Sequence, residues 1–321
     1  MKQVIQMQTE NKCLYCYKML ENGEVDYHEK CCKKFFGTTT SPKLPFSLSQ
    51  IQELAVQVLG KSVSVTGVQP KISLESHRSN RKGVRFTVVG MFGNFILKPP
   101  IEKYPEMPEL EDLTMHLAQK LNIKTAEHSL IRLGSGELAY ITKRFDRVKN
   151  NKLPLEDMAQ LTGTLTENKY RSSMERIAKV INLYSDYPGA DLISLYEMTL
   201  FALITGNADM HLKNFSLLTN QDNEVMLSPA YDMLSTKLLI PEDMEELALP
   251  LNGKKSRFRK SDFISFAEKL EINSVSIQNV HNKFQARVED IIACIDKSLL
   301  SSEMKNNYKE LLSKRMQRLF E

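Results

Sequence analysis

The sequence of 321 residues contains no run that approaches the roughly 20 apolar residues of a membrane-spanning helix. The first twelve residues also lack the apolar core of a signal peptide, so we expect a cytoplasmic protein. Internal repeats and low-complexity tracts are not visible. The charge is nearly balanced, with 43 basic and 39 acidic residues, and a nucleic-acid-binding protein would need a denser basic patch. A composition of 42% hydrophobic and 26% charged residues predicts a globular protein with a sizeable core.

A polar stretch with the sequence Asn-Ala-Asp-Met-His-Leu-Lys-Asn occupies residues 207–214. The run before it, 192–204, is apolar on nearly every side and predicts a buried helix. Two short apolar runs follow, at 215–218 and 225–227, with a polar turn between them. This pattern predicts a β-hairpin directly after the polar loop.

Three polar side chains of this region are expected to converge. Asn214 precedes the first strand of the predicted hairpin, Asp232 follows the second, and Asp209 lies at the crown of the loop. In phosphoryl transfer one carboxylate accepts the proton of the attacking hydroxyl, while a carboxamide and a second carboxylate hold Mg²⁺ on the nucleotide phosphates. Asp-x4-Asn, followed by an Asp one hairpin later, is the spacing of a kinase catalytic loop. Taken singly, each of the three is better explained as a structural residue that caps a turn, lies in a loop or ends a strand. His211 either orients Asp209 or the substrate, or is a packing residue.

Four of the five cysteines lie within about twenty residues near the N-terminus. Two residues separate Cys13 from Cys16, and two separate His28 from Cys31, which is a spacing typical of a tetrahedral zinc site. A segment of about 35 residues builds little core of its own, so the metal would supply folding energy. Free thiols and disulfides are the alternatives, and a reducing cytosol disfavours disulfides. Cys32 could replace Cys31 as the fourth ligand.

A small α+β lobe is predicted from four strand-like runs and one amphipathic helix. The runs are 84–89, 94–98, 128–133 and 137–145, and the helix is 108–121. Lys98 ends the second run, where it either grips nucleotide phosphates or extends to solvent. Glu111 lies on the border of the apolar stripe of the helix. It either turns inward to pair with Lys98 or is an acid favoured in the first turn by the helix dipole.

A loop at residues 62–71 carries several hydroxyl groups and Gly67. Its backbone N–H groups are candidates for contacting phosphates, with Gln69 and Lys71 as neighbouring contacts. An ordinary strand–turn–strand explains the composition equally well.

The remainder of the chain is mostly helical in pattern. One predicted helix begins with residues 156–160, and the others are 174–183, 192–205, 262–270, 275–300 and 302–320. We therefore divide the chain into a Cys/His segment at 1–40, a β-rich N-lobe at 46–147 and a helical C-lobe at 148–321.

Six segments, in order along the chain, resemble the HipA-like serine/threonine kinases, which are toxins of bacterial toxin–antitoxin systems. The segments are Thr66-Gly-Val-Gln-Pro-Lys71, Phe95-Ile-Leu-Lys98, Thr142-Lys-Arg-Phe-Asp-Arg147, Leu155-Glu-Asp-Met-Ala-Gln160, Gly206-Asn-Ala-Asp-Met-His-Leu-Lys-Asn-Phe-Ser216 and Ser228-Pro-Ala-Tyr-Asp232. The resemblance implies a two-lobed, protein-kinase-like α+β fold. It also implies Asp209 as the base, Asn214 and Asp232 as Mg²⁺ ligands, and Lys98 on ATP.

Further roles are implied by the same resemblance. The backbone at Lys143, Arg144 and Phe145 would read adenine. The family phosphorylates a hydroxyl of its own loop before Gly67, which ejects the loop and shuts the site, and the candidates here are Ser64 and Thr66. Relatives act on aminoacyl-tRNA synthetases and are held by a helix-turn-helix antitoxin that binds the operator DNA. Longer relatives carry an extra N-terminal subdomain of about 100 residues; the Cys/His segment stands in its place, and a small separate protein is a candidate for the missing piece.

Three hypotheses follow for the function. The first is an ATP- and Mg²⁺-dependent serine/threonine protein kinase. The second is a small-molecule phosphotransferase, since such enzymes share the Asp-x4-Asn and Asp arrangement. The third is a catalytically silent regulator whose zinc segment binds a partner. The presence of Lys98, Asp209, Asn214 and Asp232 argues against the third.

Overall fold

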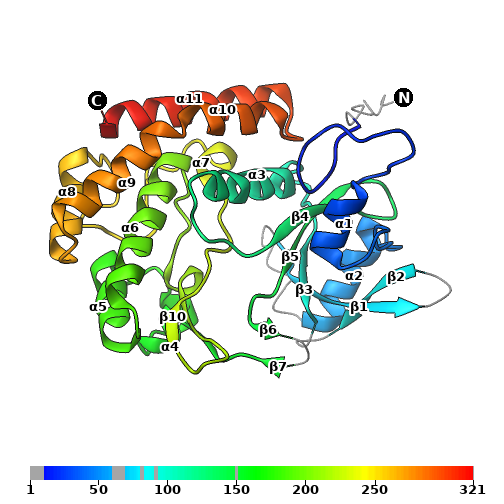
Figure 1. Cartoon of the computed structure of the whole chain (residues 1–321), viewed down its shortest axis with the longest axis horizontal. Coiled ribbons are helices and arrows are strands. Elements are labelled where there is room, and N and C mark those ends of the chain that lie inside the picture. Colours follow the sequence, from blue (N-terminus) through cyan, green and yellow to red (C-terminus); the bar gives the residue numbers. More distant parts are fainter. Residues whose placement is uncertain (1–10, 60–68, 80–82, 90–92, 149–150, 321) are drawn as a thin grey trace. The chain divides into compact units, whose positions relative to one another are not determined.

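The computed structural model describes residues 11–59, 69–79, 83–89, 93–148 and 151–320 (Figure 1). The chain forms two compact units. Unit 1 comprises the described residues of Met1–Asp112, Glu127–Arg144 and Lys297–Ser301, and unit 2 those of Leu113–Ala126, Phe145–Asp296 and Ser302–Glu321. Within these described ranges, no helix is both long and apolar enough to cross a membrane. The predicted boundaries near residues 40 and 147 stay predictions.

Unit 1 is built on a five-stranded antiparallel sheet with the strand order β2-β1-β3-β5-β4. The strands are β1 (Ile72–Ser79), β2 (Gly83–Val89), β3 (Phe95–Lys98), β4 (His128–Arg132) and β5 (Leu138–Lys143). The last four agree with the strands predicted from the sequence. In the central pair, Lys98 of β3 lies opposite Tyr140 of β5, and this register places a charged side chain beside a buried aromatic ring.

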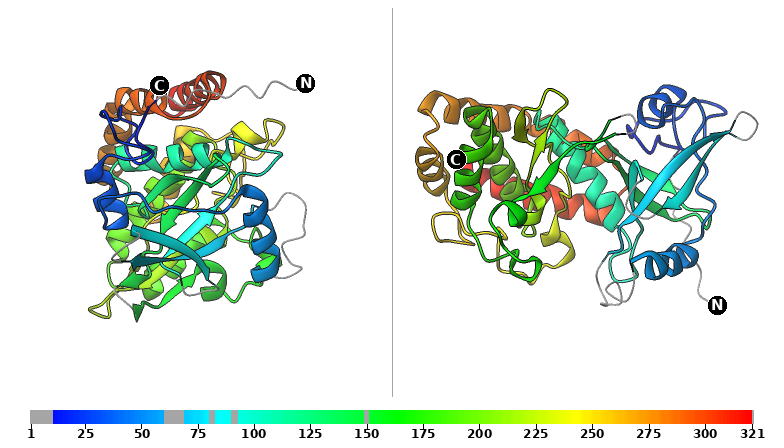
Figure 2. Two further views of the ribbon diagram at one scale, coloured as in Figure 1. Left: turned by 90° about the vertical axis from the view of Figure 1, so that its right-hand side faces the viewer. Right: turned by 90° about the horizontal axis from the view of Figure 1, so that it is seen from below.

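Two helices cover opposite faces of this sheet (Figure 2). They are α1 (Glu29–Phe36) and α2 (Leu48–Leu59). Phe35 and Phe36 of α1 pack against the sheet, with ring centroids 5.8 Å from Phe35 to Phe95 and 6.0 Å from Phe36 to Phe86. The Cys/His segment therefore shares one hydrophobic core with the strands. The burial of these aromatic rings stabilises the segment independently of any bound metal.

Unit 2 is mostly helical. Its helices are α4 (Met158–Leu161), α5 (Met174–Tyr184), α6 (Pro188–Thr205), α7 (Thr236–Leu239), α8 (Lys260–Lys269), α9 (Ser274–Ala286), α10 (Val288–Lys297) and α11 (Ser302–Phe320), and α3 (Met107–Lys120) runs into it from unit 1. Helix α6 is buried along most of its length and packs against α5 and α11. Its apolar composition on every side predicted this central position.

Short strands support the polar loop of unit 2. They are β8 (Leu155–Asp157), β9 (Ser216–Thr219) and β10 (Val225–Leu227) in the order β10-β9-β8, and a separate hairpin pairs β6 (Arg147–Val148) with β7 (Asn151–Lys152). The predicted hairpin is confirmed, because β9 and β10 pair antiparallel with Leu218 opposite Met226. Strand β8 on the other side of β9 was not predicted.

Two predicted helices differ from the structure in more than the position of their ends. The run 156–160 begins as strand β8, and helix α4 starts only at Met158, because Asp157 forms a capping box with Gln160. The long helix predicted at 275–300 is two helices, since Arg287 leaves helical geometry with φ −103° and ψ 6°. No glycine or proline marks this break in the sequence.

Candidate active site

The loop that carries Asp209 begins where the buried helix α6 ends. Gly206 caps the helix with a φ of 75°, in the left-handed region that favours glycine. A Cβ atom at this position would lie 2.8 Å from Leu311 Cδ2 and 2.9 Å from Lys237 Cβ. Both the backbone and the neighbours therefore require glycine here, and this turn sets the direction in which the polar loop leaves the helix.

Asp209 is exposed at this loop, and Tyr170 holds its carboxylate. The Tyr170 hydroxyl donates to Asp209 Oδ1 at 2.5 Å. Burial raises the pKa of Tyr170, and the hydrogen bond to the carboxylate raises it further, so the hydroxyl remains a donor at neutral pH. Tyr170 lies 39 residues before Asp209, and no local pattern in the sequence marks it as a partner of that carboxylate.

Asn214 and Asp232 lie in contact. Asn214 ends the short 3₁₀ helix η3 (Leu212–Asn214) directly before β9, and it is 3% exposed. Its Nδ2 donates to Asp232 Oδ2 at 3.0 Å, and its Oδ1 accepts the backbone N–H of His211 at 3.2 Å. Asp232 adopts a φ of 60°, a conformation that residues with side chains rarely populate and that occurs often at functional sites. The hairpin thus brings together an amide and a carboxylate, as expected from the sequence.

His211 is buried beside these groups, with 6% of its surface exposed. Burial lowers the pKa of His211, and attraction from Asp209 and Asp232 opposes the shift. Its ring meets Tyr170 edge-on at a centroid distance of 5.0 Å. Nδ1 has no hydrogen-bond partner among the residues that the structure describes. The imidazole is therefore neutral at neutral pH and packs on the residue that holds the base candidate.

In unit 1, Lys98 and Glu111 form a buried ion pair. Lys98 is 4% exposed and Glu111 is 1% exposed. The Lys98 ammonium also lies 5.3 Å from the centre of the Tyr140 ring, close enough for a cation–π interaction. Glu111 therefore turns inward, as one of the two interpretations of the sequence required. Glu111 and Tyr140 together hold the Lys98 ammonium from two sides.

The other predicted nucleotide contacts are only partly described. Ser64, Thr66 and Gly67 lie outside the described residues. Gln69 donates from Nε2 to the Pro99 carbonyl at 3.0 Å, and Lys71 is exposed. Their roles toward phosphate stay predictions.

The segment expected to read adenine leaves the sheet at the end of β5. The backbone N–H of Lys143 donates to the Glu127 carbonyl at 2.8 Å, and that of Arg144 donates to the Asn94 carbonyl at 2.9 Å. These two N–H groups are used within unit 1, so a base would have to contact other backbone groups of the segment that ends at Phe145.

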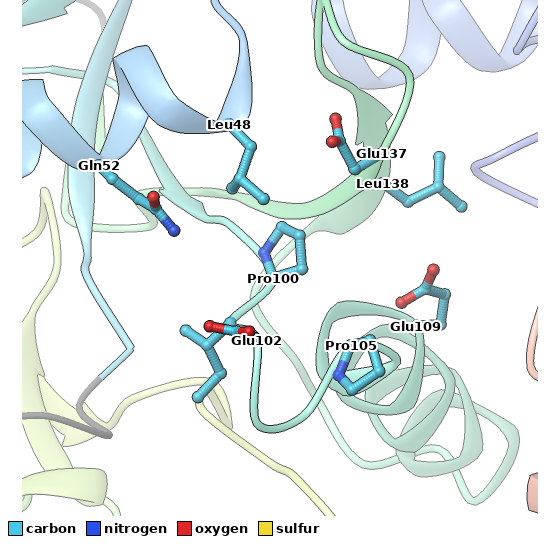
Figure 3. A pocket seen from close by; sticks show the side chains of 9 residues that line it. Leu48, Gln52, Pro100, Glu102, Pro105, Glu109, Glu137 and Leu138 are labelled. Carbon is cyan, nitrogen blue, oxygen red and sulfur yellow. The ribbon is translucent and has the colours of Figure 1, made fainter. Parts of the chain in front are cut away.

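A cavity of about 460 Å³ opens in unit 1 between Leu48, Pro100, Pro105 and Leu138 (Figure 3). None of the predicted site residues lines it. Glu109 does, and its Oε2 is buried without a hydrogen-bond partner among the described residues. Burial raises the pKa of Glu109 to about 8. This group is therefore largely protonated at neutral pH, a property that affects stability rather than phosphate chemistry.

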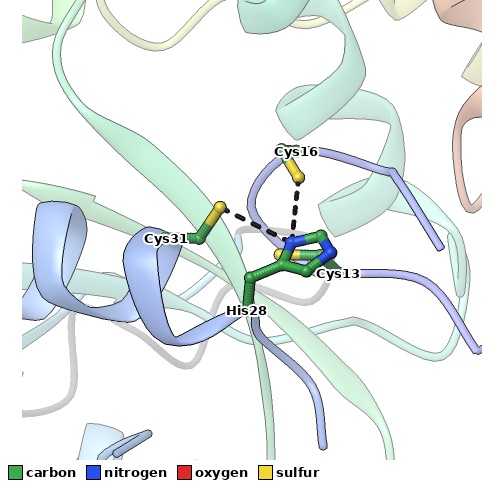
Figure 4. Close-up of side chains that lie close together, drawn as sticks. All are labelled: Cys13, Cys16, His28 and Cys31. Carbon is green, nitrogen blue, oxygen red and sulfur yellow. Dashed lines mark hydrogen bonds between the residues drawn. The ribbon is translucent and has the colours of Figure 1, made fainter. Parts of the chain in front are cut away.

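The four predicted zinc ligands gather in the N-terminal segment (Figure 4). One donor atom from each of Cys13, Cys16, His28 and Cys31 lies within 4.8 Å of the others. Cys32 faces away from this cluster, with its sulfur 3.8 Å from Thr38 Oγ1. The geometry favours Cys31 over Cys32 as the fourth ligand, and the ligand set stays a prediction.

Comparison with known proteins gives a family match over most of the chain. The family model described as HipA-like C-terminal domain matches residues 63–299. A Haemophilus influenzae protein named "Putative kinase" is 30% identical over 270 residues, which are 75% of this chain and 76% of that protein. The serine/threonine-protein kinase toxin HipA of Shewanella oneidensis is 28% identical over 216 residues, covering 60% of this chain and 47% of the toxin. The chain thus spans about half the length of that relative.

Solved structures share the fold. A chain of the Shewanella oneidensis complex of HipA, HipB and operator DNA superposes with a TM-score of 0.65 and 23% identity, over 79% of this chain and 64% of that one. The Helicobacter pylori proinflammatory kinase CtkA superposes with a TM-score of 0.50 and 17% identity, over 70% and 87%. The predicted protein-kinase-like α+β fold class is therefore confirmed.

Proposed function

We propose that this chain, which belongs to the family of HipA-like C-terminal domains, is an ATP- and Mg²⁺-dependent serine/threonine protein kinase. The observation that carries the proposal is the contact of Asn214 with Asp232 beside a loop that presents Asp209 to solvent. The kinase names of the two relatives support the reaction type.

Asp209 is the proposed base. It accepts the proton of the substrate hydroxyl as that oxygen attacks the terminal phosphate of ATP. An exposed carboxylate suits this task, because the substrate must reach it from solvent. Tyr170 binds Oδ1 and so orients the carboxylate with Oδ2 toward the hydroxyl. His211 supports Tyr170 through their ring contact.

Asn214 and Asp232 are the proposed holders of Mg²⁺. Amide and carboxylate oxygens are the ligands that this hard cation prefers. Asn214 Oδ1 accepts one hydrogen bond, from the His211 N–H, and keeps a second lone pair, while Asp232 lies within hydrogen-bond distance of Asn214, so the pair fits the ion. When bound, the ion supplies neutralisation of the charge on the nucleotide phosphates.

Lys98 is the proposed contact for the α- and β-phosphates of ATP. Glu111 and Tyr140 hold its ammonium group, so the lysine is preorganised and loses little side-chain entropy on binding. The backbone at Lys143, Arg144 and Phe145 would contact adenine. The loop with Gly67, Gln69 and Lys71 would lie near the phosphates.

Control by self-phosphorylation is part of the proposal. Ser64 or Thr66 would accept a phosphoryl group close to Gly67. A phosphate with about two negative charges there would repel the phosphates of ATP and stop the reaction. Phosphopeptide mapping after incubation with ATP tests this step, because phosphate on neither residue while substrate is turned over would contradict it.

The biological setting is proposed by analogy with the relatives. Shewanella oneidensis HipA has been solved together with HipB and operator DNA. We extend to this chain a helix-turn-helix antitoxin and a small separate protein as partners. The protein substrate would be of the aminoacyl-tRNA synthetase class.

Transfer of label from γ-³²P-ATP tests the reaction. Asp209→Asn should reduce transfer by about 10²–10⁴-fold through loss of the base, while Asp222→Asn, at an exposed turn of the same unit, should leave it unchanged. Unreduced transfer in Asp209→Asn would contradict the proposal. Label found only on a small molecule would favour the phosphotransferase hypothesis, and failure of the wild type to bind Mg²⁺-ATP would favour the silent regulator.

A further inference from the structure

The Cys/His cluster has the dimensions of an occupied metal site. His28 Nδ1 lies 3.4 Å from the sulfur of Cys16 and 3.7 Å from that of Cys31. In a tetrahedron with Zn–S bonds of about 2.3 Å and Zn–N bonds of about 2.0 Å, ligand atoms are separated by roughly 3.5–3.8 Å. All four cysteines of the segment are free thiols, so a disulfide does not explain why the sulfur atoms gather.

The histidine tautomer is set for metal binding. His28 Nε2 lies 2.9 Å from the carbonyl oxygen of Met19 and therefore donates its hydrogen to it. Nδ1 is then left without a hydrogen and faces two sulfur atoms. Metal-ligating histidines are typically fixed in this way, by a backbone carbonyl on the ring nitrogen that does not bind the metal.

The four ligand residues come from two separate parts of the N-terminal segment. Cys31 joins the loop from the first turn of α1, so two separate segments meet at the cluster.

We propose that Cys13, Cys16, His28 and Cys31 bind one Zn²⁺ ion, and that the loop held by this metal positions the Lys98–Glu111 ion pair through Tyr17. The first half of the proposal stands without the kinase function. The second half rests on the proposed role of Lys98 in nucleotide binding.

Tyr17 links the metal loop to helix α3. It directly follows Cys16, adopts a φ of 60° and is 4% exposed. Its hydroxyl donates to Asp112 Oδ2 at 2.5 Å. Asp112 is fully buried and is the neighbour of Glu111 on α3. A shift of the loop therefore acts on the helix one residue away from the partner of Lys98.

A second line of contacts reaches Lys98 from the other side. His128 Nδ1 lies 2.7 Å from Asp112 Oδ1, so both oxygens of this carboxylate are held. The His128 ring stacks on Tyr140 at a centroid distance of 5.9 Å. Tyr140 in turn lies under the Lys98 ammonium. The buried carboxylate of Asp112 thus joins Tyr17 to both partners of Lys98.

Removal of the metal would disrupt the contact between Tyr17 and Asp112, from which both lines of contacts to Lys98 start. The left-handed backbone at Tyr17 lies between two segments that carry metal ligands. Once the sulfur atoms are released, the metal no longer stabilises this backbone conformation. Withdrawal of the Tyr17 hydroxyl removes a hydrogen bond from the buried carboxylate of Asp112, which is costly. Helix α3 then moves to relieve that cost, and Lys98 loses its fixed position. Nucleotide binding becomes sensitive to zinc.

Metal content tests the first half in the full-length protein. We expect about one zinc per chain after purification without chelators, a loss in Cys16→Ser and Cys31→Ser, and retention in the matched control Cys32→Ser. Cobalt substituted into the wild type should show the intense d–d and sulfur-to-metal absorption of tetrahedral thiolate coordination. This spectrum does not depend on whether the variants fold. Wild-type protein without zinc and without a cobalt spectrum would overturn the site.

A double-mutant cycle tests the second half. Tyr17→Phe should keep zinc and lower the affinity for Mg²⁺-ADP by about 5–10-fold, which corresponds to one good hydrogen bond. Tyr15→Phe, in the same loop, should not change it. In a Lys98→Met background the effect of Tyr17→Phe should disappear, because the tyrosine acts through the lysine. A penalty that persists there, or no penalty in the first place, would overturn the coupling. If the wild type binds zinc but no ADP, the proposed function fails and the metal site stands.

Discussion

The two groups of charged residues that carry the proposed reaction are maintained in different ways. Lys98 and Glu111 are 4% and 1% exposed, and each is stabilised by the other. Asp209 is exposed, and Asp232 is held by a left-handed backbone. The position of the Lys98 and Glu111 side chains depends on their burial, whereas the position of Asp209 and Asp232 depends on the local backbone conformation. Substitutions in the pair should therefore lower stability and activity together, whereas those in the loop should lower activity alone.

The largest expected effect is that of breaking the buried pair. Glu111→Gln removes the carboxylate that pairs with the buried Lys98 ammonium, and we expect a loss of about 3–5 kcal/mol in the free energy of unfolding. Chemical denaturation measures it. Asp209→Asn is the matched comparison and should change this free energy by less than about 1 kcal/mol.

A double variant sharpens that comparison. Lys98→Met with Glu111→Leu removes both charges and should recover most of the lost stability while phosphate transfer stays absent. Equal stability of wild type and Glu111→Gln would show that the pair is not buried as described.

A smaller effect is expected where the hydroxyl of Tyr170 holds the base. Tyr170→Phe should lower the turnover rate by about 3–10-fold through loss of a hydrogen bond to a charged group. Stability should be nearly unchanged because this contact is at the surface of unit 2. Tyr184→Phe, at another exposed tyrosine, is the control. A turnover rate equal to wild type in Tyr170→Phe would remove this residue from the site.

A further effect concerns pH. Burial raises the pKa of Glu109 to about 8 in the folded protein, above the value near 4.3 of an unfolded chain. The folded state binds the extra proton, so its stability falls as pH rises between these values. Glu109→Gln should remove this dependence. Because the side chain borders a cavity and is partly exposed, we expect only about 1–2 kcal/mol at pH 8.5, or a rise of a few °C in Tm.

Comparing Tm at pH 6 and pH 8.5 tests this. The difference between Glu109→Gln and wild type should be larger at pH 8.5. A difference that does not change with pH would place the Glu109 carboxyl in solvent.

The contrast between the two groups also explains what the sequence could predict. The contact of Asn214 with Asp232 follows from local rules, because a short polar turn between apolar runs fixes a hairpin and the hairpin fixes its flanking residues. The four predicted zinc ligands could likewise be recognised from local sequence, because they form two pairs that are each separated by two residues. Their roles in metal binding and catalysis stay predictions.

Contacts between distant segments could not be predicted in the same way. Tyr17 and Asp112 are 95 residues apart, and Tyr170 and Asp209 are 39 apart. Nothing local distinguishes these tyrosines from others, because their partners are set by how the sheet and helices pack. The break between α9 and α10 at Arg287 is similar. No glycine or proline marks it in the sequence, and it depends on how each of the two helices packs.

The measurement that tests the central claim most directly is the Mg²⁺ dependence of ATP binding by wild type, Asp209→Asn and Asp232→Asn, followed by calorimetry. We expect wild type and Asp209→Asn to bind ATP more tightly with Mg²⁺ than without it, since Asp209 acts on the substrate hydroxyl. Asp232→Asn should lose this dependence. If Mg²⁺ tightens ATP binding equally in all three proteins, Asp232 does not hold the metal and the proposed site is wrong.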